Sequence, residues 1–361
     1  MLCIEKLKVN SVRNLTELNI EPAAKLNFFY GANASGKTSV LESVYLLSRI
    51  KSFRSKRIND VVQRGEQKLQ VFAKGINLDN AFTVGIEKGR GITVIKYDGE
   101  IIQTASEQAR KLPVYILTPD HHILFTGTPK DRRHWLDWSL FHVEQNYISV
   151  WKSYHKALRH RNALLKNERA VNSSELTGWE KLMAEEAQKI DLMRIQYISN
   201  LNTYLNNNYL PFVLPKEGLV KYLNENYQDQ DLSELLANNR SEDINRGYTS
   251  IGPHRVDISF SYDDFYVAKH LSRGQTKLFG SAVVSSQIRI LKEANIDAIL
   301  LVDDLDAELD ETSSKNMYEL LVNNNIQTFV SSLTKPIWFN EENSENALFH
   351  VKHGNVEKMV E

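Results

Sequence analysis

The chain has 361 residues, of which 42% are hydrophobic and 25% are charged, and its formal net charge is −1. These values are typical of a soluble globular protein of one large or two ordinary domains. No run of about 18 apolar residues is present, which argues against a transmembrane helix and a membrane partner. Because the net charge is so small, a nucleic-acid partner would need a local basic surface.

The first residues carry acidic and basic side chains without an apolar core, so they do not resemble a secretion signal. Cys3 is the single cysteine. One cysteine cannot form an internal disulfide, which fits a reducing compartment. We therefore expect a cytoplasmic protein.

Two strands are predicted before a glycine-rich loop, over residues 2–9 and 25–30, and a helix is predicted after it, to about Ile50. The loop has the pattern G-x-x-x-x-G-K-T and consists of Gly31, Ala32, Asn33, Ala34, Ser35, Gly36, Lys37, Thr38 and Ser39. Strand, glycine loop and helix in this order predict a phosphate-binding loop for ATP. The alternative is a glycine turn before an ordinary helix, and the flanking strand argues against it.

Each position that the motif specifies has a chemical role. Gly31 and Gly36 allow a sharp turn in which backbone N–H groups converge on a phosphate, at the positive end of the following helix. Lys37 is expected to reach the β- and γ-phosphates, and Thr38 to ligate Mg²⁺. ATP and Mg²⁺ are therefore the predicted cofactors.

A basic cluster follows the helix, and its cations are Lys51, Arg54, Lys56 and Arg57. One interpretation is a solvated loop. The other is a contact with phosphate, either of the nucleotide or of DNA.

The next stretch predicts an antiparallel meander over residues 69–74, 81–88 and 93–97, and then a short strand over 114–117. From Pro129 the pattern becomes helical. Apolar residues predict a helix over about 145–166 and a second one with a heptad seam over 176–204, joined by a polar turn at 167–174. Such a pair forms an antiparallel hairpin.

One face of the first hairpin helix is basic, because Lys152, Lys156 and Arg159 are spaced four and three residues apart. A charged stripe is usually the solvated side of a helix, and contact with the DNA backbone is the alternative. Residues 206–247 show only weak helical pieces, and a strand is predicted over 248–258. We therefore predict a head formed by residues 1–120 and 248–361 and an inserted helical domain over 121–247.

The downstream part supplies the second half of an ATP site. Ser272, Arg273, Gly274 and Gln275 open a predicted helix that ends near Glu293, and they resemble the signature motif of ABC-type ATPases. A plain helix N-cap explains Ser272 about as well, but its place in the order of motifs favours the signature.

An apolar strand over 298–302 ends in Asp303 and Asp304, which is a Walker B pattern. Asp303 would hold Mg²⁺, and Asp304 would orient the attacking water. The following Ala307-Glu308-Leu309-Asp310 resembles a D-loop. The strand over 326–332, predicted as the last one, carries serines where ABC enzymes usually have a histidine, which argues against fast hydrolysis.

This order of motifs resembles the heads of SMC proteins. The resemblance narrows to the RecF family of bacterial recombination mediators through further stretches: Ser52-Phe53-Arg54, Gly127-Thr128-Pro129, Arg132-Arg133, Leu136-Asp137, Tyr154, residues 161–166 and Ser250-Ile251-Gly252-Pro253-His254-Arg255. It covers nearly the whole chain and implies an α/β fold, an ABC-type P-loop ATPase head with an inserted helical arm.

The resemblance also implies a function. The protein would bind ATP and DNA, form a homodimer on ATP and act with RecO and RecR at gapped DNA to promote RecA loading. Arg13 and Asn33 would contact phosphate, and the signature residues would complete the site of the opposite subunit. Hydrolysis would be slow, stimulated by DNA, and would reset the dimer.

Other classes remain open from the motifs alone. An ABC ATPase subunit could serve a membrane partner or a repair nuclease, and a P-loop kinase would use the same phosphate loop. DNA-stimulated ATPase activity, membrane copurification and phosphoryl transfer to a metabolite would separate them.

Overall fold

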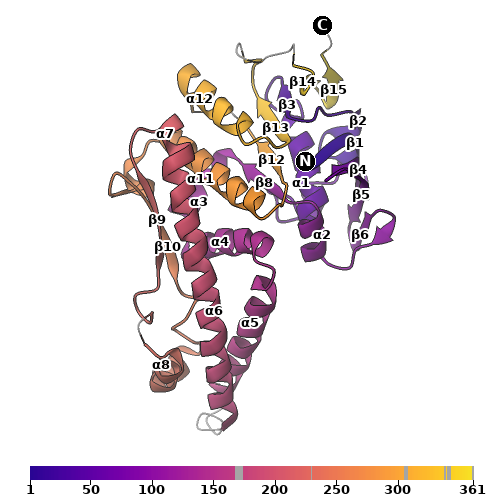
Figure 1. Ribbon diagram of the computed structural model, residues 1–361. Helices are drawn as coiled ribbons and strands as arrows, with labels where there is room; N and C mark the ends of the chain where they lie inside the picture. Colours follow the sequence, from indigo (N-terminus) through magenta and orange to yellow (C-terminus); the bar gives the residue numbers. More distant parts are fainter. Residues whose placement is uncertain (167–173, 229, 305–307, 337–338, 340–342, 360–361) are drawn as a thin grey trace. The chain divides into compact units, whose positions relative to one another are not determined.

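The computed structural model describes residues 1–166, 174–228, 230–304, 308–336, 339 and 343–359. The chain divides into two compact units, which we call the head and the arm (Figure 1). The head consists of Met1–His121, Phe212–Leu214 and Ser272–Glu361, and the arm of His122–Pro211 and Pro215–Leu271. The predicted turn over 167–173 and Ala307 of the predicted D-loop lie outside the described residues.

A mostly parallel sheet in the head has the strand order β15-β14-β3-β13-β12-β8. Its strands are β3 (Leu26–Tyr30), β8 (Val114–Leu117), β12 (Ile299–Val302), β13 (Thr328–Ser332), β14 (Asn346–Lys352) and β15 (Asn355–Lys358). Only β15 pairs antiparallel. The loops after β3, β12 and β13 therefore emerge at one edge of the sheet, where α/β proteins bind ligands. The prediction that β13 is the last strand is wrong, because β14 and β15 follow it.

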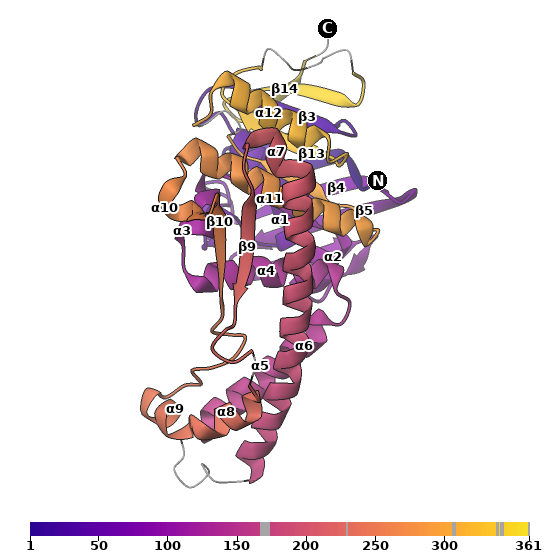
Figure 2. The same cartoon turned by 60° about the vertical axis from the view of Figure 1, so that its left-hand side comes forward.

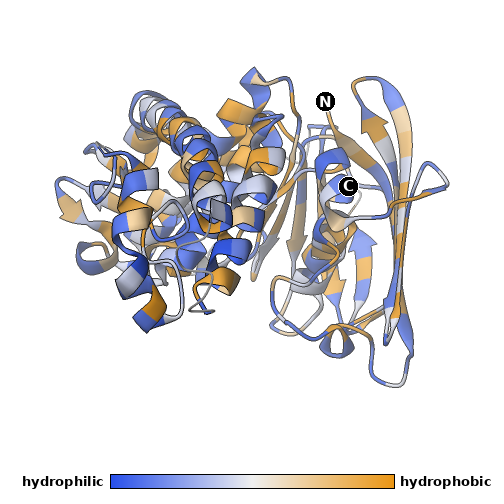
Figure 3. Ribbon diagram, turned by 90° about the horizontal axis from the view of Figure 1, so that it is seen from below, coloured by the Kyte–Doolittle hydropathy of each residue, from blue (hydrophilic) through white to orange (hydrophobic). Residues whose placement is uncertain are grey.

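A second sheet in the head is antiparallel, with the order β2-β1-β4-β5-β6-β7. Its strands are β1 (Cys3–Val12), β2 (Leu15–Ile20), β4 (Lys68–Asn77), β5 (Asn80–Gly89), β6 (Ile92–Tyr97) and β7 (Glu100–Ile101). Hydrophobic and hydrophilic residues alternate along these strands, so one face is buried and the other meets solvent (Figure 3). Strand β2 was not among the predicted elements, because only three apolar residues mark it.

Helix α1 (Lys37–Arg49) is buried on nearly all sides and packs against strands of both head sheets. One hydrophobic core contains side chains from both sheets and from this helix. The head also contains η1 (Ile58–Asp60), α2 (Ala105–Lys111), α11 (Arg273–Glu293) and α12 (Glu311–Val322). A helix held this firmly fixes the loop that precedes it.

The arm is built on the predicted helical hairpin, α5 (Tyr147–Leu164) and α6 (Ser174–Tyr204), which lie side by side (Figure 2). Its shorter helices are α3 (Ile123–Thr126), α4 (Pro129–Val143) and η4 (Leu205–Tyr209), whereas η2 (Pro119–His122) and α7 (Leu210–Val213) have residues in both units. The seam on α6 is buried at Leu176, Met183, Ile190 and Tyr197, at intervals of one heptad.

The arm also contains a sheet with the order β11-β10-β9, and its strands are β9 (Gly218–Leu223), β10 (Asp257–Tyr262) and β11 (Phe265–Tyr266). The helices α8 (Leu232–Asn238), α9 (Arg240–Arg246) and α10 (Val267–His270) complete it. Because β10 pairs with β9, residues 248–271 belong to the arm, and the predicted boundary at residue 248 lies too early.

The predicted strand over 248–258 is also wrong for residues 248–256, which form turns and coil. Gly252 has a φ of 128°, which is incompatible with a regular strand, and Pro253 cannot donate to a sheet ladder.

Among the described residues, no helix is long and apolar enough to cross a membrane.

Candidate nucleotide site

The glycine loop connects β3 to α1, as the motif predicts. Gly31 has a φ of 153°, and a Cβ there would lie 2.2 Å from the carbonyl oxygen of Val351, so no other residue fits. Gly36 has a φ of 122° and forms the N-cap of α1. The ammonium of Lys37 donates hydrogen bonds to the carbonyl oxygens of Gly31 (2.8 Å) and Ala32 (3.0 Å), so this cation lies at the start of the loop.

The predicted magnesium ligands lie together. The hydroxyl of Thr38 donates to Asp303 Oδ1 at 2.9 Å, and the hydroxyl of Ser331 donates to the same oxygen at 2.7 Å. Burial raises the pKa of Asp303, while the hydrogen bonds from Ser331 and Thr38 lower it in part. The parallel pairing of β12 with β13 places Asp303 and Ser331 at adjacent strand ends.

This pair of oxygen donors fits Mg²⁺, which proteins commonly bind through one or two side chains while phosphate and water complete the octahedron. No group of three or more His, Cys, Asp or Glu suited to a metal occurs in the part of the chain that the structure describes. Thr38 and Asp303 would hold the ion, and it would neutralise charge on the phosphates.

The end of β12 is held by the neighbouring elements. Asp304 has a φ of 50°, and its N–H donates to the hydroxyl of Ser331 at 2.8 Å. Its carbonyl accepts a hydrogen bond from the ammonium of Lys277 on α11, a residue that the sequence did not suggest. Where ABC enzymes have a histidine, Ser331 binds Asp303 and the hydroxyl of Ser332 donates to the carbonyl of Thr334.

Asn14, in the β1–β2 turn, braces the glycine loop and was missed from the sequence. Its amide donates to the carbonyls of Ala34 (3.3 Å) and Ser35 (3.0 Å), and its Oδ1 accepts from the hydroxyl of Ser39 (2.9 Å). Only its position beside Arg13, far from the loop in sequence, could have indicated this.

Arg13 was predicted to contact phosphate. In the structure its guanidinium binds Glu42 through two hydrogen bonds, at 2.8 and 2.9 Å, and a third reaches the carbonyl of Asp60. The hydrogen bond with Glu42 raises the pKa of Arg13. Glu42 is fully buried in α1, so this ion pair ties the hairpin to the helix that carries Lys37.

The signature motif begins α11 with a capping box. The N–H of Gln275 donates to the hydroxyl of Ser272 (3.2 Å), and the N–H of Ser272 donates to Gln275 Oε1 (3.0 Å). A Cβ at Gly274 would lie 2.7 Å from the carbonyl oxygen of Glu308, so the backbones approach closely here. Arg273 is exposed and pairs with Glu308 at 3.2 Å.

Asp310 of the predicted D-loop is the N-cap of α12 and accepts hydrogen bonds from the N–H and the hydroxyl of Ser313, at 2.8 and 2.9 Å. The hydrogen bond from the Ser313 backbone lowers the pKa of Asp310. Its local role is therefore that of a helix cap.

The predicted DNA-contacting cations are exposed in both units. Arg54, Lys56 and Arg57 lie in the head loop after α1, and Lys152, Lys156 and Arg159 lie on one face of α5. Burial raises the pKa of Asp303, a predicted magnesium ligand, and the charge of Arg54 lowers it by less than the hydrogen bonds from Ser331 and Thr38 do.

Several stretches that carried the family resemblance are structural. Arg161 is fully buried and binds Glu180, Asp243 and the hydroxyl of Thr249. These contacts fix α5 to α6 and to the segment before β10. The sequence alone could not separate this arginine from its exposed neighbours on α5.

The Gly-Pro-His-Arg stretch is held in the same way. His254 Nδ1 lies 2.7 Å from the hydroxyl of Tyr154, and Nε2 lies 3.1 Å from the carbonyl of Thr249. Burial lowers the pKa of His254 to about 4. A Cβ at Gly252 would lie 2.5 Å from the Tyr154 hydroxyl, so glycine is required there.

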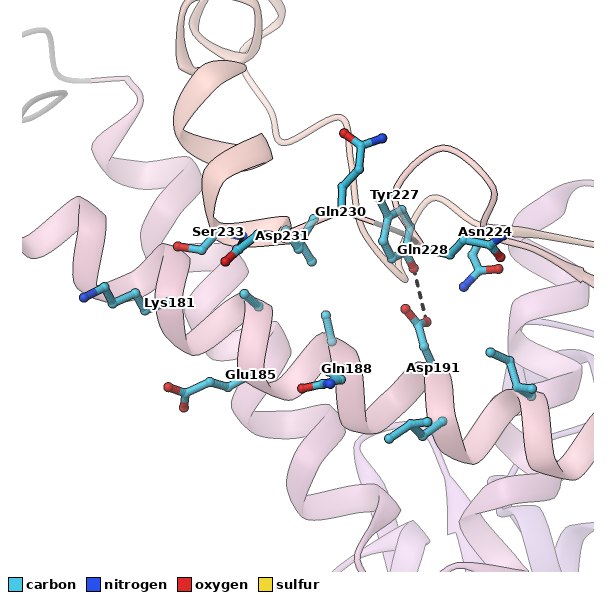
Figure 4. A pocket seen from close by; sticks show the side chains of 15 residues that line it. Lys181, Glu185, Gln188, Asp191, Asn224, Tyr227, Gln228, Gln230, Asp231 and Ser233 are labelled. Atoms are coloured by element: carbon cyan, nitrogen blue, oxygen red, sulfur yellow. Dashed lines mark hydrogen bonds between the residues drawn. The ribbon is translucent and has the colours of Figure 1, made fainter.

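A cavity of about 590 Å³ in the arm lies between α6 and residues 224–228 and 230–233 (Figure 4). Asp191 in its wall accepts a hydrogen bond from the hydroxyl of Tyr227 at 3.1 Å. Burial raises the pKa of Asp191. The cavity contains no residue of the glycine loop, so it is separate from the nucleotide site.

Comparisons with known proteins show the family to which the chain is similar over nearly its whole length. The model of the RecF/RecN/SMC N terminal domain family matches residues 3–357. A DNA replication and repair protein RecF of Pseudoalteromonas translucida (strain TAC 125) is 35% identical over 361 residues, which cover 98% of this chain and 99% of the relative. The protein of that name from Shewanella frigidimarina (strain NCIMB 400) is 32% identical, with 98% of both chains covered.

Solved structures are similar as well. The structure of the recombination mediator protein RecF-ATP in the RecFOR pathway matches with a TM-score of 0.86 and 25% identity, over 99% of this chain and 98% of that chain. An Smc head domain from Pyrococcus furiosus matches with a TM-score of 0.62 and 16% identity, over 99% and 96% of the two chains. These likenesses confirm the predicted fold class.

Proposed function

The chain belongs to the RecF family, within the RecF/RecN/SMC N-terminal domain proteins, and from this membership we propose that it is an ATP-dependent DNA-binding protein of recombinational repair. By analogy with the RecFOR pathway, it acts in the cytoplasm with RecO and RecR at gapped DNA and promotes RecA loading. The observation that carries the proposal is the hydrogen-bonded group of Thr38, Asp303 and Ser331 at the end of the glycine loop.

ATP is part of the proposed subunit interface. Within one chain the glycine loop and Lys37 bind the phosphates, and Thr38 with Asp303 holds Mg²⁺. The signature helix of a second copy, capped by its own Ser272, closes over the γ-phosphate with its N-terminal N–H groups. ATP therefore favours the dimer, because only the dimer makes both sets of contacts.

Hydrolysis releases the dimer in this scheme. Asp304 orients the water and accepts its proton as the water oxygen attacks the γ-phosphorus. The bond between the γ-phosphorus and the bridging oxygen breaks, and ADP and phosphate are the products. The proposed rate is slow, because Ser331 and Ser332 occupy the strand end where ABC enzymes usually have a histidine. DNA stimulates it by holding two subunits together.

Sedimentation of the purified protein tests this proposal, with ATP, with ADP and without nucleotide, in the presence and absence of gapped DNA. The expected result is a dimer with ATP that DNA strengthens. Lys37→Arg is expected to abolish it by weakening ATP binding. Ser272→Arg should keep ATP binding by the single chain and lose the dimer.

Two outcomes would contradict the proposal. A monomer under every condition would remove the paired-site mechanism, and an intact ATP-driven dimer in Ser272→Arg would remove the signature helix from the interface. An ATP analogue that is not hydrolysed serves as the matched control, since it should stabilise the dimer for longer than ATP does.

A further inference from the structure

The solvent-facing side of the antiparallel head sheet has an unusual row of residues. The strand register places Lys8, Phe72, Gly85 and Lys96 opposite one another on β1, β4, β5 and β6. Phe72 is 39% exposed, although it lies on a central strand. A shallow cavity of about 360 Å³ lies over these four residues.

Gly85 leaves a hollow beside the Phe72 ring. A Cβ added at Gly85 would meet only Phe72 Cδ2, at 3.7 Å, and the carbonyl oxygen of Val71, at 4.0 Å, which are ordinary contacts. The backbone at Gly85 therefore does not require glycine. Phe72 and Gly85 both line the cavity, so the ring borders the space that a side chain at position 85 would occupy.

The charge of this surface is positive. Lys8, Lys74 and Lys96 are exposed, and within the described residues none of the three forms an ion pair with a carboxylate. The cavity wall also contains one carboxylate, Glu87, whose charge is balanced by Lys68 at 2.9 Å and which accepts a hydrogen bond from the amide of Gln70 at 2.7 Å. Because the whole chain has a net charge of −1, three unpaired lysines around one exposed ring are a local concentration of positive charge.

We propose that this face, defined by Phe72, Gly85 and the lysines at 8, 74 and 96, binds single-stranded nucleic acid. A base stacks on Phe72 over the hollow at Gly85, and the lysines contact the flanking phosphates. Aromatic residues among cations on an open sheet are the usual means of binding single strands without sequence preference. The proposal rests on the DNA-binding function proposed above and adds to it the surface that holds the single strand, which contains no residue of the nucleotide site.

Fluorescence anisotropy with a labelled oligo(dT) of roughly 15 nucleotides tests the surface, in the full chain and without ATP. Phe72→Ala is expected to weaken binding about tenfold, because one stacked base is lost. Gly85→Val fills the hollow and should weaken binding while melting at the same or a higher temperature, since valine suits a strand better than glycine. This second variant separates loss of binding from loss of folding.

The salt dependence of binding tests the role of the lysines. The triple change Lys8→Gln, Lys74→Gln and Lys96→Gln should reduce the slope of log affinity against log salt by about 2. The control, Lys315→Gln with Lys358→Gln, removes two exposed lysines elsewhere in the head and should change the slope by much less than two-thirds of that amount.

Unchanged oligo(dT) binding in both Phe72→Ala and Gly85→Val would overturn the proposal. An equal loss of duplex binding in these variants would also overturn it, because it would indicate a general polyanion patch without stacking. ATP-driven dimerisation, measured on the same samples, is expected to be unchanged. If the unmodified protein did not dimerise with ATP, the proposed function would be contradicted, whereas the proposal for this surface would still stand on its oligo(dT) binding.

Discussion

Asn14 shows how a single exposed residue can organise a binding loop. Its side-chain amide bonds two loop carbonyls and the hydroxyl of Ser39, so it ties the second half of the glycine loop to the first turn of α1. Arg13 beside it makes the same hairpin rigid through the buried Glu42. Asn14 and Arg13 thus hold the loop in place by hydrogen bonds, whereas Asp303 and Asp304 would act on a bound ligand through their charge.

We predict that Asn14→Ala weakens ATP binding about tenfold, because hydrogen bonds worth roughly 1 kcal/mol each no longer hold the loop in its binding form. Titration with a fluorescent ATP analogue measures this. Asn19→Ala, at an exposed position on β2, is the control and should bind as the parent protein does. Normal ATP affinity in Asn14→Ala would show that the loop is rigid without this brace.

His254 should make the stability of the arm depend on pH. Burial lowers its pKa from 6.5 to about 4, so between these values the folded arm binds fewer protons than the unfolded chain. The contribution is therefore complete above pH 6.5 and is lost as the pH falls toward 4, by up to about 3 kcal/mol.

Urea unfolding at pH 7 and pH 5, for the parent chain and for His254→Gln, measures this contribution. The variant should be less stable at pH 7, because the Tyr154 hydroxyl loses its partner, and should lose less stability on acidification. An equal loss in both proteins would assign the pH dependence to other groups, such as the carboxylates of the arm.

At the scale of elements, the arm depends on buried ion pairs across its helices. Arg161 on α5 binds Glu180 on α6 and Asp243 on α9, and all three side chains are buried. Removing the cation would leave two carboxylates in a dry interior, where unpaired charge is costly.

We therefore predict that Arg161→Ala destabilises the arm by about 3–5 kcal/mol. The matched control is Arg246→Ala, which removes an exposed pair with Glu242 and should cost at most about 0.5 kcal/mol. Denaturant unfolding followed by circular dichroism gives both values. A small loss in Arg161→Ala would mean that Arg240, which also binds Glu180, takes over its role.

The elements that the sequence predicted well were the ones with strong local patterns. The heptad seam on α6, the apolar strand β12 and the glycine loop each depend on residues close together in the chain. Strand β9 was missed, because its alternation covers only residues 218–223 and its pairing partner β10 begins at Asp257. The turns over 248–256 are fixed by Tyr154 and Arg194, which are far away in sequence.

The candidate site was predictable to a similar extent. The motif spacing predicted Lys37, Thr38 and Asp303, because phosphate chemistry requires those residue types. The residues that hold them, Asn14 and Lys277, follow from tertiary contacts alone. Motif matching therefore predicted the groups that are expected to meet a ligand and missed the groups that hold them in position.

At the scale of the whole molecule, a net charge of −1 gives DNA no long-range attraction, so binding must depend on local cations. The exposed row on α5, Lys152, Lys156 and Arg159, is the clearest such group in the arm. We predict that changing all three to Gln lowers the salt slope of duplex binding by about 2 to 3.

The control for this prediction changes Lys189, Lys216 and Lys221 to Gln, which removes the same charge from arm lysines that are already paired with carboxylates. Filter binding of a short duplex over a range of salt concentrations, with ATP, measures both slopes. Equal slopes in the two triple variants would remove the α5 row from the DNA surface.

The pairing of β3 with β13 and β14 determines the order in which the protein can fold. Strand β3 (residues 26–30) pairs with residues 328–332 and 346–350, which are far away in sequence. The central sheet therefore cannot form completely until nearly all of the chain has been synthesised. The arm needs only residues that emerge earlier. On the ribosome, the arm is therefore expected to fold first, and the ability to bind nucleotide arises in the last moments of synthesis. A chain cut short before β13 would carry a folded arm and an open sheet edge, which cells treat as a substrate for chaperones and proteases.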